Sequence, residues 1–312
     1  MSAQDLKIAT VDIGSNSFLL LLCTANKNGI VSIKNDVVEI VRLGQGLATS
    51  KRFMPEALER AKTTLTTFKR MIDEFQPDVV LPKATAAARI AENRADLLTI
   101  GKNLGLDIET IPGEQEAKVT YQGVFWGQKT DETGFNLLID IGGGSTELIV
   151  GKGAQIEYSI SIPFGAVLLT EKFIKNHPVS VQDEKNLLAE IESGIAPAII
   201  AISKFPIKTV LAVAGTPTTL AQIILGGYDD SKINGYRLSH ETLLDLENKL
   251  KIRTVEQRIQ ELGVPKGRAD ILYSGAILLR KIIEAVNLKS VTVSTRGVRH
   301  GIVADYFLSQ PQ

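Results

Sequence analysis

The sequence predicts an α/β protein built from two copies of one fold. A turn is repeated without a gap, as VDIGSNS at residues 11–17 and IDIGGGS at residues 139–145, and both copies place an Asp before a run of small residues. Each half also begins with apolar strands joined by tight turns and continues with alternating helices and strands. A chain of 312 residues is long enough for two domains of ordinary size. Duplication of one α/β unit accounts for these observations together.

The first half predicts a three-stranded meander followed by alternating helices and strands. Its strands are apolar runs bounded by turn residues, and its helices show apolar residues three to four positions apart. Pro55 is suited to the first turn of a helix. The expected strands are residues 8–13, 18–23, about 30–41, 79–84 and 106–111, and the expected helices are residues 55–75, 87–104 and 113–125.

The second half repeats this order and adds helices. The expected strands are residues 137–141, 146–150, 155–162, 209–214 and 291–294. The expected helices are residues 166–176, 181–203, 217–225, charged helices within about 239–262, 266–286 and a last helix after His300. We therefore expect a first domain at residues 1–123, to which the C-terminal helix at about 300–312 returns, and a second domain at residues 124–299.

Composition excludes several classes of function. The 35 basic and 35 acidic side chains give a net charge of zero, whereas non-specific binding to nucleic acid or anionic membranes needs a basic excess. No signal peptide or membrane-spanning run is recognisable, so we expect a cytoplasmic protein. The single cysteine, Cys23, lies in an apolar run and is expected in the core. His177, His240 and His300 lack the spacing of a zinc site.

The repeated turns predict phosphate-binding loops. Small residues after a buried strand allow a ligand to approach backbone N–H groups, and glycine permits positive φ there. Asp12 and Asp140, at the strand ends, are suited to a hard cation such as Mg²⁺. A single turn of this kind would equally be a tight hairpin capped by its Asp. The loop residues expected to bind phosphate are Gly14, Ser15, Asn16, Ser17, Gly142, Gly143, Gly144, Ser145 and Thr146.

A third loop supports an anionic ligand. Gly215 and Thr216 follow the strand at 209–214 and precede a helix, whose N-terminal N–H groups and dipole favour anions. The loop occupies the same place in the second half as residues 84–87 in the first. A well-capped helix start without a ligand is the alternative. We include Gly215 and Thr216 among the phosphate-binding residues.

The chain resembles the exopolyphosphatase and guanosine pentaphosphate phosphohydrolase (Ppx/GppA) family, within the actin-like ATPase superfamily. The likeness covers nearly the whole chain, in the order of the family. It lies in VDIGSNSF at residues 11–18, ATAAAR at 84–89, GEQEA at 113–117, DIGGGSTEL at 140–148, AVAGTPTTLA at 212–221, GRADILYSGAILL at 267–279 and RGVRHG at 296–301. The resemblance implies duplicated ribonuclease H-like domains, an active-site cleft between them, the short two-domain form of the family, and a homodimer.

The resemblance also implies the catalytic roles. Glu116 is the expected base that activates water, with Glu114 as its internal competitor, because residues two apart on a helix do not share a face. Arg89 is expected to donate to the transferred phosphoryl group. Asp140 and Glu147 are expected to hold Mg²⁺ or to help orient the water, and Asp12 is the other expected metal ligand; Mn²⁺ is an alternative to Mg²⁺. Weaker candidates for contacting the rest of a polyanion are Lys118, Arg268, Arg296 and Arg299. The sequence departs from the family at His300, where relatives commonly carry an acid.

The function expected from this resemblance is Mg²⁺-dependent exopolyphosphatase activity, which releases orthophosphate from the end of inorganic polyphosphate. The main alternative is hydrolysis of the 5′-phosphate of pppGpp to give ppGpp by the same residues. Two further alternatives are an alarmone- or nucleotide-binding regulator without turnover and a small-molecule kinase. The sequence does not separate polyphosphate from pppGpp as the preferred substrate.

Overall fold

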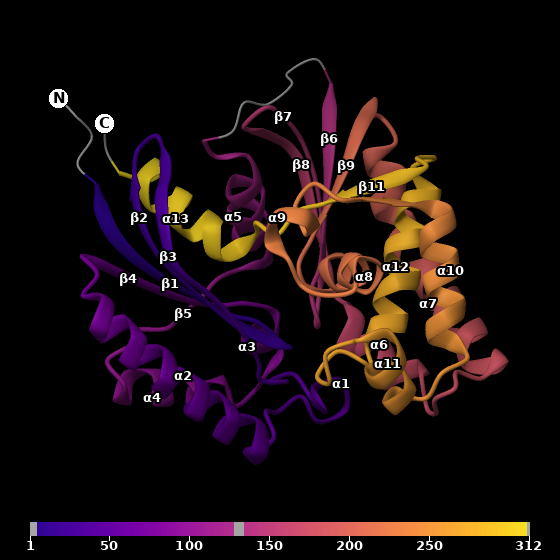
Figure 1. Ribbon diagram of the computed structural model, residues 1–312, viewed down its shortest axis with the longest axis horizontal. Coiled ribbons are helices and arrows are strands. Elements are labelled where there is room, and N and C mark those ends of the chain that lie inside the picture. The colour runs from indigo at the N-terminus through magenta and orange to yellow at the C-terminus, as the bar shows by residue number, and fades with distance from the viewer. Residues whose placement is uncertain (1–4, 128–133, 311–312) are drawn as a thin grey trace. The chain divides into compact units, whose positions relative to one another are not determined.

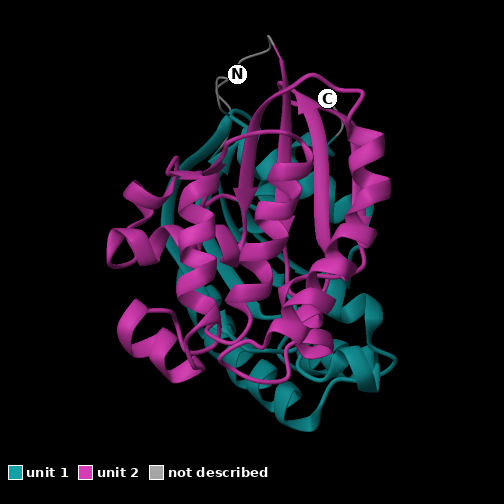
Figure 2. Ribbon diagram, turned by 90° about the vertical axis from the view of Figure 1, so that its right-hand side faces the viewer, with its two compact units in different colours: residues 1–130, 297–312 teal, residues 131–296 magenta. Residues whose placement is uncertain are grey.

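The chain crosses twice between two α/β units, which are distinguished by colour in Figure 2. The computed structural model describes residues 5–127 and 134–310. Unit 1 comprises Met1–Thr130 and Gly297–Gln312, and unit 2 comprises Asp131–Arg296. Within the described part of the chain, no helix combines the length and the apolar character that crossing a bilayer requires.

Unit 1 contains a five-stranded sheet of order β3-β2-β1-β4-β5. The first three strands form an antiparallel meander, and β4 and β5 add in parallel. The strands are β1 (Leu6–Ile13), β2 (Ser17–Asn26), β3 (Gly29–Ile40), β4 (Val79–Ala84) and β5 (Glu109–Thr110). The helices are α1 (Leu47–Ser50), α2 (Pro55–Phe75), α3 (Ala86–Ile90), α4 (Arg94–Asn103), α5 (Gly113–Phe125) and α13 (Val298–Leu308).

Alternation along β1 separates the two faces of this sheet. Ala9, Val11 and Ile13 belong to the core that α2 and α4 cover. Ile8 packs with Val303 of α13 on the other face, and Figure 1 shows α13 beside the strands of this sheet. Because successive strand residues point to opposite faces, Asp12 lies at the end of β1 on the face of α13.

Helices α5 and α13 approach each other backbone to backbone. A Cβ atom on Gly301 would lie 1.5 Å from the carbonyl oxygen of Val119, and one on Gly123 would lie 2.2 Å from the carbonyl oxygen of Gly297. Glycine is therefore required at both positions for the helices to pack at this distance. This contact holds the C-terminal helix against the helix that carries Glu116.

Unit 2 repeats the same sheet and extends it by one edge strand. Its order is β10-β11-β9-β6-β7-β8. Taken across the sheet, the strands β8-β7-β6-β9-β11 correspond to β3-β2-β1-β4-β5 of unit 1, and β10 is the additional edge strand. The strands are β6 (Phe135–Ile141), β7 (Thr146–Lys152), β8 (Gln155–Ile162), β9 (Ile207–Val213), β10 (Arg237–Ser239) and β11 (Ser290–Val293). The helices are α6 (Ala166–Phe173), α7 (Val181–Ile202), α8 (Gly215–Leu225), α9 (Asp230–Ile233), α10 (His240–Lys251), α11 (Val255–Leu262) and α12 (Leu272–Ala285). The predicted duplicated α/β fold is confirmed.

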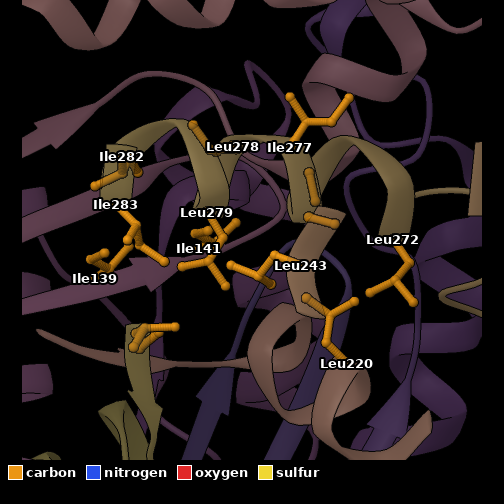
Figure 3. Packing of buried hydrophobic residues seen from close by; sticks show 14 of the residues in the cluster. Ile139, Ile141, Leu220, Leu243, Leu272, Ile277, Leu278, Leu279, Ile282 and Ile283 are labelled. Atoms are coloured by element: carbon orange, nitrogen blue, oxygen red, sulfur yellow. The ribbon is translucent and has the colours of Figure 1, made fainter. Parts of the chain in front are cut away.

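The core of unit 2 forms where α12 packs on the sheet. In Figure 3, Leu279 and Ile283 of α12 lie beside Ile141 and Ile139 of β6. All of these side chains are buried. Asp140, between the two isoleucines, therefore points to the opposite face of the sheet.

The structure corrects several expected elements. The helix expected at residues 87–104 is two helices, because the Asn93 side chain accepts from the backbone N–H of Phe53 at 2.7 Å and donates to its carbonyl at 3.2 Å. This tertiary contact interrupts an otherwise helical sequence. The strand expected at 106–111 is only Glu109–Thr110, and the helix expected at 266–286 begins at Leu272. Helices α1 and α9 and strand β10 were not predicted.

Candidate active site

The two repeated turns have the same backbone geometry. The N–H of Gly14 donates to the carbonyl of Ser17 at 3.1 Å, and the N–H of Gly142 donates to that of Ser145 at 3.0 Å. The expectation of positive φ at the glycines was wrong, because neither Gly14 nor Gly142 has a positive φ. Glycine is favoured by close approach instead: a Cβ atom would lie 2.9 Å from the Ser17 oxygen in one turn and 3.1 Å from the Ser145 oxygen in the other.

The segment that follows each meander holds its turn in place. In unit 1, the N–H groups of Arg42 and Gly44 donate to the carbonyls of Asn16 and Ser15, at 2.8 and 2.7 Å. In unit 2, the N–H of Ala166, at the start of α6, donates to the carbonyl of Gly142 at 2.9 Å. In each unit, backbone N–H groups of a later segment thus hold the carbonyl groups of the expected phosphate-binding turn by hydrogen bonds.

Unit 2 places a row of polar side chains across three strands. Asp140 on β6 pairs with Glu147 on β7, which pairs in turn with Ser161 on β8. Directly paired residues share a face of the sheet. Glu147 is 0% exposed, and the Ser161 hydroxyl donates to its Oε1 at 2.6 Å. The expected residue Thr146 lies outside this row, and its hydroxyl donates to the Phe164 carbonyl.

Sequence reasoning missed Ser161. Its strand was predicted, but only the register of the β7–β8 hairpin places this serine opposite Glu147. The register is set by tertiary pairing and shifts by one residue between Val150 and Gly151. A serine in alternation with apolar strand residues was the only available signal.

The Asp140 and Glu147 carboxylates fit a magnesium ion. Mg²⁺ favours oxygen ligands, and proteins commonly hold it through one or two carboxylates while water and phosphate oxygens complete the coordination. Among the described residues, no group of three or more His, Cys, Asp or Glu side chains could hold a metal ion. The donor set therefore suits a cation that shares its coordination with a phosphate ligand.

The third expected metal ligand, Asp12, lies in a different row, within unit 1. It is buried and pairs with Leu19 on β2 and with Lys83 on β4. Leu19 pairs with Val38 on β3. Unit 1 therefore has an aliphatic residue at each position where unit 2 has Glu147 or Ser161.

Unit 1 instead buries a carboxylate beside an arginine. Glu116, in the first turn of α5, is 6% exposed, and its Oε2 accepts from Nη1 of Arg89 at 2.5 Å. The same Nη1 donates to the carbonyl of Ile111 at 3.1 Å. Glu114 is exposed, so the structure separates the two acids of this motif as their helical spacing predicts.

Opposing effects act on the pKa of Glu116. Burial raises this pKa above the ordinary glutamate value, whereas the charge and hydrogen bond of Arg89 and a hydrogen bond from Thr85 lower it. A buried carboxylate whose basicity is raised while its ionised form stays hydrogen-bonded has the properties of a general base.

Thr85 is a second residue that sequence reasoning did not single out. It is the N-cap of α3, and its backbone N–H donates to the carbonyl of Ile13 at 3.2 Å. Its side-chain hydroxyl donates to the same carbonyl at 3.5 Å, and the hydroxyl lowers the pKa of Glu116, so Thr85 links the end of β1 to the buried acid. Its position within the ATAAAR motif was the available signal.

The third loop expected to bind phosphate, at Gly215 and Thr216, is part of a helix. Helix α8 begins at Gly215 rather than at 217, so Gly215 and Thr216 lie in its first turn. The preceding Ala214 has φ 71° and ψ −164°, a conformation that costs a non-glycine residue free energy. Arg268 donates to the carbonyl of Gly215 at 2.8 Å and to the Thr219 hydroxyl at 2.9 Å. Burial lowers the pKa of Arg268.

Two of the basic side chains considered for contacting a polyanion form ion pairs within unit 1. Arg299 is buried and donates through Nε and Nη2 to both oxygens of Asp36, at 2.6 and 2.8 Å. Nε2 of His300 lies 3.9 Å from the same carboxylate. Lys118 forms an ion pair with Asp305 at 2.9 Å. The structure thus assigns Arg299 to the interior of the unit rather than to a polyanion.

Comparison with known proteins identifies the relatives of this chain. Residues 24–310 match the model of the Ppx/GppA phosphatase family. The chain is 31% identical to exopolyphosphatase 2 of Mycobacterium tuberculosis, over 95% of this chain and 97% of that protein. It is 29% identical to guanosine-5′-triphosphate,3′-diphosphate pyrophosphatase of Aliivibrio fischeri, over 94% of this chain but only 58% of that protein. The crystal structure of the Aquifex aeolicus family member matches with a TM-score of 0.82 and 29% identity, over 99% of this chain and 100% of that one.

Proposed function

The chain belongs to the Ppx/GppA phosphatase family, and on that premise we propose that it is an exopolyphosphatase. The proposed reaction is hydrolysis of the terminal phosphoanhydride bond of inorganic polyphosphate, with release of orthophosphate and dependence on Mg²⁺. The similarity to a protein named exopolyphosphatase, over nearly the full length of both chains, supports this substrate class.

The observation that carries the proposal is the buried pair of Glu116 and Arg89. A carboxylate at this depth, with a raised pKa, is suited to accept a proton from water. The attacking water oxygen bonds to the terminal phosphorus while its proton passes to the Glu116 carboxylate. The bond from that phosphorus to the bridging oxygen breaks, and the shortened chain leaves with this oxygen.

The other residues stabilise charge and position the substrate. Arg89 uses Nη1 for Glu116 and Ile111, which leaves the remaining N–H groups of its guanidinium as donors for a phosphoryl oxygen. Asp140 and Glu147 would hold Mg²⁺, which supplies charge neutralisation to the transferred phosphoryl group when bound. The turns and the first turn of α8 offer backbone N–H groups to phosphate oxygens.

Phosphate release from purified protein tests this proposal. Polyphosphates of several lengths are incubated with Mg²⁺ and, separately, with Mn²⁺, and orthophosphate is measured over time. Orthophosphate release that stops when the cation is chelated is the expected result. Absence of release from every chain length with either cation would overturn the proposal.

The second candidate is hydrolysis of pppGpp to ppGpp, which the similarity to the Aliivibrio fischeri enzyme favours. Competition on one preparation separates the two substrates, because the substrate with the higher kcat/KM inhibits release from the other. Tight binding of pppGpp without release of phosphate would instead indicate a regulator without turnover. The homodimer stays a prediction, which light scattering of the purified protein tests.

A further inference from the structure

We propose that Ser161 is a positioning residue that holds Glu147 in the orientation required for binding a divalent cation. This inference rests on the proposed function in one respect, since it takes Glu147 to be a cation ligand. It adds a residue that is remote in sequence from the turn at residues 140–146 and that reaches Glu147 only through the pairing of β7 with β8.

The contact between the two side chains is short, and the glutamate side chain in it is fully buried. The Ser161 hydroxyl donates to Oε1 of Glu147 at 2.6 Å, within the range of a hydrogen bond to an ionised carboxylate. Glu147 is 0% exposed, and Ser161 is half-buried. Since the residues form a direct cross-strand pair, the backbone of the sheet holds the donor and the acceptor in register.

The hydroxyl acts on the last torsion of the glutamate side chain. Rotation about this torsion is broad in glutamates, so a hydrogen-bond donor can favour one plane of the carboxylate. A donor on Oε1 selects one orientation of that plane before the cation arrives. Partners of this kind, which contact a ligand rather than the metal, typically change metal affinity by about 10-fold to 100-fold.

The other unit provides an internal comparison. In the matching row of unit 1, Leu19 stands at the position of Glu147, and Val38 stands at the position of Ser161. The hydroxyl is thus present in the row that has the second carboxylate and absent from the row that lacks it. This is the pattern expected if Ser161 serves the carboxylate rather than the sheet.

Direct measurement of metal binding tests the proposal without using catalysis. Binding of Mn²⁺ to the full chain is followed by electron paramagnetic resonance or by calorimetry. The central comparison is Ser161→Thr against Ser161→Val, because threonine and valine have nearly the same shape and both suit a strand, but only threonine keeps the hydroxyl. We expect Ser161→Thr to bind Mn²⁺ like the wild type and Ser161→Val to bind about 10-fold to 100-fold more weakly.

The chain offers a matched control two residues away. Ser159 lies on the same face of β8 and is also half-buried, but its cross-strand partner is Ile149. Ser159→Val should leave the affinity for Mn²⁺ unchanged. Ser161→Ala is a smaller change that repeats the loss of the hydroxyl if valine does not fit, and circular dichroism confirms that each variant is folded.

The kinetics provide a second readout. In Ser161→Val, the Mg²⁺ concentration that gives half-maximal phosphate release should rise by the same factor as the Mn²⁺ dissociation constant, while kcat at saturating Mg²⁺ changes little. A loss of kcat at saturating Mg²⁺ with unchanged Mn²⁺ affinity would overturn the proposal.

The outcomes also separate this proposal from the proposed function. If the wild type hydrolyses polyphosphate and Ser161→Val binds Mn²⁺ as tightly as Ser159→Val, the positioning role is wrong and the function stands. If Ser161→Val weakens Mn²⁺ binding in a protein that hydrolyses neither polyphosphate nor pppGpp, the positioning role stands and the function is wrong. A wild type that binds no Mn²⁺ would overturn the positioning role.

Discussion

The two units have the same arrangement of strands but differ in the side chains beside the central aspartate. Asp12 and Asp140 each stand one residue before the end of equivalent strands, and the turns that follow are closed by the same backbone hydrogen bond. Next to Asp140 stand Glu147 and Ser161, whereas the positions next to Asp12 hold Leu19 and Val38. Duplication has therefore preserved the sheet and the turn while the polar row differs between the copies.

The units also differ in where they carry their second acid. Unit 2 has its acid on a strand, within the sheet itself. Unit 1 has Glu116 on a helix, held by Arg89 from another helix. A strand pair sets the spacing of side chains rigidly and suits cation ligands, whereas a carboxylate beside an arginine suits proton transfer. Unit 1 thus carries the candidate base, and unit 2 carries the candidate cation ligands.

The largest expected effect comes from removing the base in unit 1. Glu116→Gln keeps the shape of the side chain and its capacity to accept from Arg89, but it removes the proton acceptor. We expect kcat for phosphate release to fall by about 10²-fold to 10⁴-fold. Glu114→Gln is the matched control, because Glu114 is exposed in the same helical turn. Equal activity of the two variants would show that Glu116 is not the base.

The next effect comes from making unit 2 resemble unit 1. Glu147→Leu places at this position the residue that unit 1 has at Leu19. A leucine suits the buried site, so we expect a folded protein that binds Mn²⁺ much more weakly and releases phosphate on the order of 10²-fold more slowly. Glu157→Leu, at an exposed position of β8, should retain both properties. Full activity of Glu147→Leu would show that Glu147 is not a required cation ligand.

A smaller effect concerns the pH dependence of the base. Burial raises the pKa of Glu116, and Arg89 opposes this rise. In Arg89→Met the pKa of Glu116 should therefore rise further. Activity requires the ionised base, so the acidic limb of the kcat profile should move to higher pH. Arg94→Met, which removes an exposed arginine from α4, should leave the profile in place.

The sign of the accompanying stability effect is also defined. Because the folded-state pKa of Glu116 is raised, the protonated form stabilises the native state, and this stabilisation is lost as the pH rises through the folded-state pKa. Arg89→Met should therefore lose more stability on going from acidic to neutral pH than the wild type does. Urea unfolding at several pH values measures this difference, and an unchanged pH dependence would contradict the assigned direction.

The smallest expected difference lies between the two turns. A Cβ atom would approach a carbonyl oxygen to 2.9 Å in Gly14→Ala and to 3.1 Å in Gly142→Ala. Each substitution should lower the free energy of unfolding by about 1–3 kcal/mol, with Gly14→Ala the more destabilising by less than about 1 kcal/mol. Gly227→Ala is the control, because a Cβ atom there meets nothing within 4 Å. A clearly larger loss of unfolding free energy in Gly142→Ala would show that the surroundings of the two turns differ although their backbone hydrogen bonds match.

Elements with strong local signals could be predicted closely. The helix at Pro55–Phe75, the helix at Gly113–Phe125 and the strand at Gln155–Ile162 have the predicted bounds. Their periodicity, with Pro55 at a helix start and glycines at the turns, is contained in neighbouring residues. The break between α3 and α4 could not be predicted, because Asn93, in the segment between the two helices, bonds to Phe53, far away in the sequence.

The same distinction applies to the candidate site. Glu116 and Glu147 were recognised through their motifs, and the predicted separation of Glu116 from Glu114 follows from the geometry of one helix. Neither Ser161 nor Thr85 was recognised, since their roles depend on which carboxylate they contact. The glycines of the turns were recognised, but the positive φ expected of them was wrong, and the close approach of Ser17 and Ser145 is visible only in three dimensions.

By itself the sequence determined the duplicated α/β fold, the two aspartate turns and the acids within its motifs, because these depend on residues that are neighbours along the chain. The tertiary structure alone decided the partners of those acids. Strand register placed Ser161 against Glu147, and the packing of α3 and α5 placed Arg89 against Glu116. Contacts between distant segments are set by the packing of the whole unit, which local patterns of residues do not encode.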